Sequence, residues 1–244
     1  MQSSSASAIG ACQKLLDLSV VLVASQKSSG LEAMLTSLCP HCPYCQYCLS
    51  CECYEIIVVD RNPAKEEELS LHGTLPSKIR ALKTNVDSMG PAAAFNQGLA
   101  KARGKMVLAM MGDAQGVTPR LISTLKMVSA RHESTIVLCP SFSLEQEPEY
   151  WTYEREEDAY RLFDLCSFSN SWKNELFYPV GDGHSIAMPL KMWSELDGYD
   201  TVFKSRGGGI ANFDLLVRAL SLPGAQLAVL RGEGSFHQGP ATGA

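Results

Sequence analysis

The stretch YEIIVVD, residues Tyr54–Asp60, contains four consecutive β-branched apolar residues and ends in a carboxylate. Such runs are typical of parallel strands that are buried on both faces of a sheet. LSVVLVA at Leu18–Ala24 has the same character. Shorter apolar runs predict two more strands, at Lys78–Lys83 and Lys105–Met111. The first half of the chain therefore contains four predicted strands.

Helical patterns separate these strands. After the Ser28–Gly30 break, leucine and methionine recur at helical spacing as far as Leu38. A second, small-residue helix is predicted at Ala92–Ala102, with Gly104 as its C-cap. Alternating strands and helices predict an α/β fold with a mostly parallel central sheet flanked by helices.

The second half of the chain is less regular. A helix is predicted at Pro119–Ala130, and strands at Ser134–Pro140 and near His184–Met188. ANFDLLVRAL predicts a further helix, and QLAVLRGEG a last strand. With no repeat or linker, we expect one domain over residues 18–238, with a polar tail at 1–17 and another at 239–244.

The composition restricts the class of protein. The 244 residues are 45% hydrophobic, which is too apolar for a disordered chain. Twenty-one Lys and Arg face 26 Asp and Glu, so the net charge of −5 gives no basic footprint for nucleic acid. No apolar run approaches the ~20 residues of a transmembrane helix, and no targeting leader is visible. The cytoplasm is the expected compartment.

Two aspartates follow predicted strands. Asp60 ends the Tyr54 strand, and Asp113 comes just after the strand that ends at Met111. In open α/β sheets, ligands bind beyond the carboxyl ends of the strands, where the strand order reverses. We therefore expect the two carboxylates to meet across one crevice.

The order of four motifs resembles family 2 glycosyltransferases of the GT-A fold, from about Leu18 to Gln238. These motifs are YEIIVVD, GPAAAFNQGLAKARGK, LAMMGDAQGVTPRL and GGGIANFDLLVRALSLPGAQLAVLRGEGSFHQ. The last is similar to one subgroup of these enzymes. The resemblance implies a metal-assisted transfer of a sugar from a nucleotide diphosphate donor to an acceptor hydroxyl that the sequence does not identify.

The resemblance also implies site residues. Nucleotide-binding positions match Ala24, Ser25, Asp60, Asn96 and Gly98. Turn formation at Asp60 and close helix–strand packing at Gly98 are the alternatives.

The implied metal ligands are Asp113 and His237, because a carboxylate and an imidazole suit Mn²⁺, or Mg²⁺ with diphosphate oxygens and waters. A divalent ion would act as a Lewis acid toward the leaving diphosphate. Met111 replaces the first aspartate of the family's D-x-D motif. A turn-capping role for Asp113 and a structural role for His237 are the alternatives.

The catalytic base is not evident. Where the family usually has an aspartate, this chain has Asn212, whose neutral amide has no useful proton affinity. Asp182 and Asp214 are the candidate bases, with turn and helix-start roles as alternatives. An inactive nucleotide-sugar-binding module is therefore the second hypothesis for the function.

Six of the nine cysteines lie between Cys39 and Cys53, mostly at C-x-x-C spacing. That spacing suits Zn²⁺ or an iron–sulfur cluster, but the even repeat matches no finger or ferredoxin pattern. An exposed cysteine-rich insertion and disulfides are the alternatives. A metal- or redox-responsive protein built on an α/β scaffold is the third hypothesis.

Overall fold

The computed structural model describes residues 16–24, 29–38, 54–60, 79–83, 90–112, 116–144, 185–204 and 209–238. Its main feature is a seven-stranded sheet with the order β3-β2-β1-β4-β8-β6-β9. The strands are β1 (Leu18–Ala24), β2 (Tyr54–Asp60), β3 (Ile79–Lys83), β4 (Met106–Met111), β6 (Thr135–Cys139), β8 (Ser185–Pro189) and β9 (Gln226–Val229).

The sheet is mostly parallel, as predicted. Only β8 runs antiparallel to its neighbours, which are β4 on one side and β6 on the other. The other neighbouring pairs are parallel. Hydrogen bonding starts slightly before β1, because the backbone N–H groups of Lys105 and Met106 donate to the carbonyls of Leu16 and Asp17.

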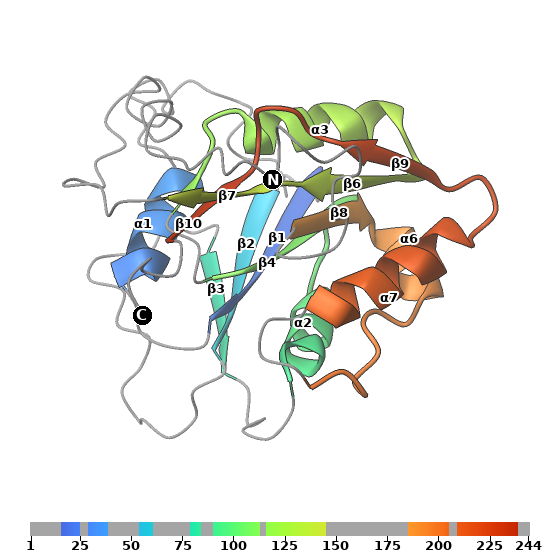
Figure 1. Cartoon of the computed structure of the whole chain (residues 1–244), viewed down its shortest axis with the longest axis horizontal. Helices are drawn as coiled ribbons and strands as arrows, with labels where there is room; N and C mark the ends of the chain where they lie inside the picture. The colour runs from blue at the N-terminus through green and yellow to red at the C-terminus, as the bar shows by residue number, and fades with distance from the viewer. Residues whose placement is uncertain are drawn as a thin grey trace, which may run out of the picture.

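Helices cover both faces of the sheet (Figure 1). One face packs against α1 (Ser29–Leu38) and α3 (Leu121–Arg131), and the other against α2 (Pro91–Leu99), α6 (Leu190–Glu195) and α7 (Gly209–Leu220). Alternate β1 residues belong to different cores: Val20 and Leu22 face α1 and α3, whereas Val21 and Val23 face α2 and α7. This two-sided burial explains why β1 and β2 consist mostly of apolar residues.

A second, three-stranded sheet has the order β5-β10-β7, with β5 at Gly116–Val117, β7 at Ser141–Leu144 and β10 at Ser235–Gln238. It was not predicted. The stretch QLAVLRGEG predicted one strand, but the strand ends at Val229 and the following FHQ segment joins a different sheet. Among the described helices, none is long and apolar enough to cross a membrane.

Candidate functional site

The carboxyl ends of β2, β1 and β4 lie level with one another. Ala24 of β1 pairs with Asp60 of β2, and Val23 pairs with Met111 of β4. The ladder continues one step beyond β4, because the Gly112 N–H donates to the Val23 carbonyl at 2.9 Å. Neighbouring strands lie ~4.8 Å apart, so the ends of β2 and β4 are separated by roughly 10 Å.

This edge is also where the strand order reverses. From β1 the chain passes through α1 to β2 on one side, and from β3 it returns through α2 to β4 on the other side. Because α1 and α2 cover opposite faces, their connections diverge between β1 and β4. In α/β proteins, ligands bind at the carboxyl edge beside such a divergence.

Two of the predicted nucleotide-binding residues lie at this edge. Ala24 is buried at the end of β1, and the neighbouring Asp60 is half-buried at the end of β2. Ser25, Asp113 and Asp182 lie outside the described residues, although Asp113 directly follows Gly112 in the sequence. Their predicted roles stay predictions.

The small sheet determines where the His237 backbone lies. β10 runs antiparallel to β5 and pairs Phe236 with Gly116, so His237 follows at the end of β5 where the chain arrives from β4. In the other direction, His237 pairs with Ser143 of β7. The polypeptide segment that carries His237 is thus built into the same side of the molecule as the carboxyl end of β4.

Thr118 fastens β10 in this position. Its hydroxyl donates to Glu233 Oε2 at 2.5 Å and accepts a hydrogen bond from the Gly234 N–H at 3.0 Å. Gly234 has no room for a side chain, because a Cβ there would lie 2.1 Å from the Pro140 carbonyl oxygen. Sequence reasoning did not identify these contacts, although the T-P and GEG motifs mark the residues involved.

Asn96 and Gly98 both make structural contacts on α2. The Asn96 side chain donates to the Tyr199 carbonyl and accepts from the Tyr199 N–H, each at 2.8 Å. A Cβ on Gly98 would lie 2.3 Å from Val21 Cγ1, so the helix packs directly on β1. Close packing, the alternative for Gly98, is therefore present, and nucleotide contact by either residue stays a prediction.

Asp214 forms an ion pair within α7. Arg218 Nε donates to Asp214 Oδ2 at 2.8 Å, and the same guanidinium donates to the carbonyls of Leu196 and Gly198. The Asp214 carboxylate thus orients an arginine that holds the turn after α6. The turn itself requires unusual backbone, since Gly198 has a φ of +69°.

Asn212 lies two residues before Asp214. Its side-chain oxygen accepts a hydrogen bond from the Tyr199 hydroxyl at 3.0 Å. Burial raises the pKa of that phenol, so it remains a neutral donor. Tyr199 also stacks on Phe95 of α2, with 5.0 Å between ring centroids. The family motifs on α2 and α7 consequently meet in one network around Tyr199.

A buried carboxylate lies at the opposite, amino edge of the sheet. Glu55 Oε2 accepts from Arg80 Nη2 at 2.7 Å and from Arg103 Nη2 at 2.8 Å, while Oε1 accepts from the Ser19 hydroxyl at 2.8 Å. Burial by itself raises the pKa of the Glu55 carboxyl. The hydrogen bonds from Arg103 and Ser19 and the Arg80 charge outweigh burial, so the pKa is lowered from its usual value. This position is a structural anchor and not part of the carboxyl edge.

The cysteine segment 39–53 lies outside the described residues, and its metal and disulfide hypotheses stay predictions. The described residues on either side of it are in contact, because the Tyr54 hydroxyl donates to the Leu38 carbonyl at 2.8 Å. The segment therefore leaves and re-enters the fold at the amino end of β2, away from Asp60. Within the described ranges, no group of three or more His, Cys, Asp or Glu side chains could hold a metal ion.

Comparison with known proteins supports the family resemblance. The model of the family described as glycosyl transferase family 2 matches residues 19–182, about two thirds of the chain. No curated protein sequence matches the chain.

Solved structures of glycosyltransferases share its fold. TarS 1-349 of S. aureus in complex with UDP-GlcNAc is 14% identical, with a TM-score of 0.60 over 92% of this chain and 59% of its own. The mannosyltransferase PcManGT of Pyrobaculum calidifontis, in complex with GDP-Man and Mn²⁺, is 16% identical, with a TM-score of 0.60 over 93% of this chain and 58% of its own. GalNAc-T7 with UDP, GalNAc and Mn²⁺ is 16% identical, with a TM-score of 0.64 over 94% of this chain and 45% of its own. The chain thus spans roughly half the length of these proteins, and the predicted GT-A-like fold is confirmed.

Proposed function

Because the chain belongs to glycosyl transferase family 2, we propose that it transfers a sugar from a nucleotide diphosphate donor to an acceptor hydroxyl. One observation carries this proposal. The ends of β2, β1 and β4 are level, so Asp60 lies two strands away from the strand that leads directly to Asp113. That spacing of ~10 Å suits a nucleotide whose base or ribose meets one carboxylate and whose diphosphate meets the other.

We assign the nucleoside to the β1 and β2 ends. Asp60 would accept hydrogen bonds from the base or the ribose, and Ala24 and Ser25 would contact the base. A half-buried carboxylate can do this because its oxygens are strong acceptors for N–H and O–H donors.

We assign the diphosphate to the end of β4. Asp113 would hold a divalent cation there, and His237 would complete its ligands or contact the diphosphate. The chemistry of the pair fits Mn²⁺, which accepts both carboxylate and imidazole, and the placement of β10 brings the His237 backbone to this side of the molecule. A cation bound there would offset the negative charge that develops on the leaving diphosphate.

The same comparison supports a proposal for the donor class. The similar structures hold UDP-GlcNAc, GDP-Man or UDP, and two of them hold Mn²⁺. We therefore propose a UDP- or GDP-linked sugar as the donor for this chain.

Titration calorimetry with UDP or GDP in the presence of Mn²⁺ tests the proposal. The wild-type chain should bind at least one of these nucleotides, and Asp113→Asn should weaken binding by at least ~10-fold because the metal loses a charged ligand. Asp60→Asn should weaken binding without changing the dependence on Mn²⁺, because its contact is to the nucleoside.

Glu195→Gln is the matched control, since it removes one carboxylate on α6, a helix that follows the amino-edge end of the antiparallel strand β8. It should bind as the wild type does. Failure of every nucleoside diphosphate to bind, with either Mn²⁺ or Mg²⁺, would disprove the proposal.

A second candidate function is an inactive nucleotide-sugar-binding module. The Asp214–Arg218 ion pair favours it, because the Asp214 carboxylate is already engaged by an arginine of its own helix and not by a reacting group. Asn212 cannot act as the catalytic base, because its side chain is a neutral amide. Under this reading the wild-type chain would bind UDP but release no sugar from a UDP-sugar. Donor hydrolysis that disappears in Asp182→Asn would instead identify Asp182 as the base.

A further inference from the structure

The outer face of α7 is an apolar stripe on which none of the described residues packs closely. Ile210, Phe213, Val217 and Leu220 are 63%, 56%, 49% and 42% exposed, although all four are large and hydrophobic. We call these four residues the α7 stripe. The opposite face of the helix carries the buried residues that pack on the sheet, among them Leu215.

The spacing of the α7 stripe is that of a helix–helix seam. Successive members are three, four and three residues apart, as at the a and d positions of a heptad repeat. Two helices with such seams pack side by side at a crossing angle of ~20°. An amphipathic helix needs only one apolar face to pack on its own domain, so α7 carries a second face that its own sheet does not use.

The order of the intervals between these residues, three, four and three, is the same from either end of the helix. When a second copy of α7 is placed antiparallel to the first, Phe213 of one copy lies against Val217 of the other, and Ile210 lies against Leu220. Each residue of the α7 stripe then contacts an apolar residue of the other copy. A two-fold axis relates the two copies, so each of these contacts occurs twice. Self-complementarity of this kind is what a symmetric homodimer requires.

The area of the α7 stripe suits a dimer interface. Four large side chains, each about half exposed, present on the order of 400 Å² of apolar surface, which is the size of the largest and often functional patch on a typical monomer. A standard interface buries ~800 Å² per partner, of which slightly more than half is apolar. The stripe therefore supplies the apolar part of one such interface.

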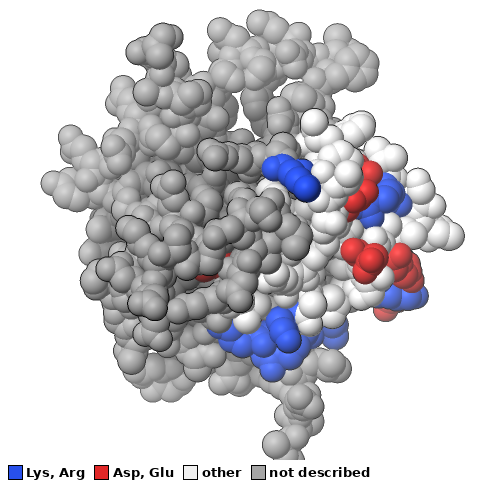
Figure 2. Space-filling model, turned by 90° about the horizontal axis from the view of Figure 1, so that it is seen from below, with Lys and Arg blue, Asp and Glu red and all other residues white. Residues whose placement is uncertain are grey.

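Charge does not oppose the pairing. The two charged residues of α7, Asp214 and Arg218, neutralise each other at 2.8 Å, and Arg218 is held by carbonyls of its own chain. Where the described surface is visible from below, uncharged area lies between the charged groups (Figure 2). The only charged side chains of α7 itself are therefore an Asp and an Arg that already pair with each other.

From this face we propose that two copies of the chain associate through the α7 stripe, antiparallel and about a two-fold axis. The proposal is independent of the transferase assignment, because it uses no residue of the carboxyl edge.

Sedimentation equilibrium of the full chain tests it. The wild type should sediment with twice the 26.5 kDa mass of one chain, and the apparent mass should fall on dilution. Phe213→Glu and Val217→Lys should each weaken association by more than about 100-fold, because each places a charge in the centre of the seam. Mixed in equal amounts, the two variants should associate again, because the antiparallel register places the new carboxylate against the new ammonium.

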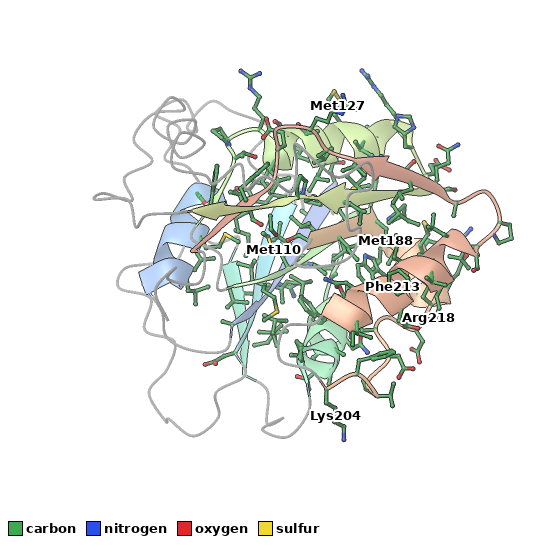
Figure 3. All side chains as sticks on the ribbon, viewed as in Figure 1. Met110, Met127, Met188, Lys204, Phe213 and Arg218 are labelled. Carbon is green, nitrogen blue, oxygen red and sulfur yellow. The ribbon has the colours of Figure 1, made fainter. Side chains whose placement is uncertain are left out.

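Met127→Glu is the matched control. Met127 is 50% exposed on α3, at the other side of the sheet from Phe213 (Figure 3). This variant should remain dimeric. A monomeric wild type, or a Phe213→Glu variant that keeps its two-chain mass, would overturn the proposal and leave the stripe to a partner of different sequence. Rescue by mixing excludes the explanation that the single variants are merely misfolded.

Discussion

Gly98 shows how a single residue determines the distance between a helix and the sheet. The Cβ of any other residue at this position would lie 2.3 Å from Val21 Cγ1 and 3.0 Å from Val59 Cγ2. Both valines are fully buried, so they have little room to move. Glycine is thus required at this position by packing, whatever its relation to a nucleotide.

We expect Gly98→Ala to destabilise the protein by about 1–3 kcal/mol, since overpacking a rigid core exceeds the gain of up to ~1 kcal/mol in helix propensity. Urea denaturation followed by circular dichroism measures the change. Gln97→Ala, at the exposed neighbouring position on α2, should be neutral or slightly stabilising. Equal stability of Gly98→Ala and the wild type would show that α2 moves away from β1 at little cost.

At the scale of elements, α2 is tied to the turn after α6 by one side chain. The side-chain amide of Asn96 makes two hydrogen bonds with the Tyr199 backbone. Its Nδ2 donates to the Tyr199 carbonyl, and its Oδ1 accepts from the Tyr199 N–H. The adjacent rings of Phe95 and Tyr199 stack, and Arg218 of α7 holds the same turn through the Gly198 carbonyl. Three helices on one face of the sheet thereby share one anchoring turn.

Asn96→Asp should destabilise this arrangement by about 1–3 kcal/mol, because a carboxylate keeps the acceptor but loses the donor to the Tyr199 carbonyl. The deficit should shrink at acidic pH, where the introduced carboxyl is protonated and can donate again. Denaturant melts at pH 7 and pH 4 measure it. Gln97→Glu introduces the same charge at an exposed position of α2 and serves as the control. A deficit that is independent of pH would contradict this hydrogen-bond account.

For the whole molecule, Glu55 joins four separate segments at the amino edge. It binds Ser19 of β1, Arg80 of β3, and both the backbone N–H and the guanidinium of Arg103, which precedes β4. Its side chain is 4% exposed, so these partners replace its water. Glu55 therefore holds the amino ends of these strands together through charged and neutral hydrogen bonds.

Glu55→Gln should lower the free energy of unfolding at pH 7 by about 2 kcal/mol or more, because a buried network loses its central charge. The native pKa of Glu55 is lowered, so the ionised carboxylate stabilises the fold fully above its unfolded pKa of ~4.3. That contribution disappears as the pH falls through the native value. The difference between wild type and variant should therefore shrink below about pH 4.

Chemical denaturation across this pH range measures the effect. Glu195→Gln removes an exposed carboxylate that lies 3.7 Å from Lys191, and should change stability by less than ~0.5 kcal/mol. A Glu55→Gln deficit that grows at acidic pH would show that the carboxyl is not held in its charged form.

Much of this architecture can be predicted from short stretches of the sequence. The consecutive Val, Ile and Leu residues of β1 and β2 indicate burial on both faces of the sheet, because these side chains cannot face water at low cost. Asp60 is visible as the first polar residue after such a run. Family motifs then connected that strand end with Asp113 and His237, although neither side chain is among those that the structure describes.

Pairing over long sequence distances was not visible in this way. Within the seven-stranded sheet, β8 is the strand that runs antiparallel. β10 does not pair with β9 but joins β5 and β7, which lie more than 90 residues earlier in the chain. The contacts of Asn96 with Tyr199 span 103 residues, and those of Thr118 with Glu233 span 115. Neither the partner nor the register of such contacts has a local signal.

By itself, the sequence determined the α/β class, the buried strands and the strand-end carboxylate Asp60, because solvent exposure and backbone preference act on each residue locally. Only the tertiary structure decided that the ends of β2, β1 and β4 are level, that Asp214 binds Arg218, and that α7 keeps a second apolar face. Each of these depends on which segments meet in space. The packing of the whole fold determines which segments become neighbours.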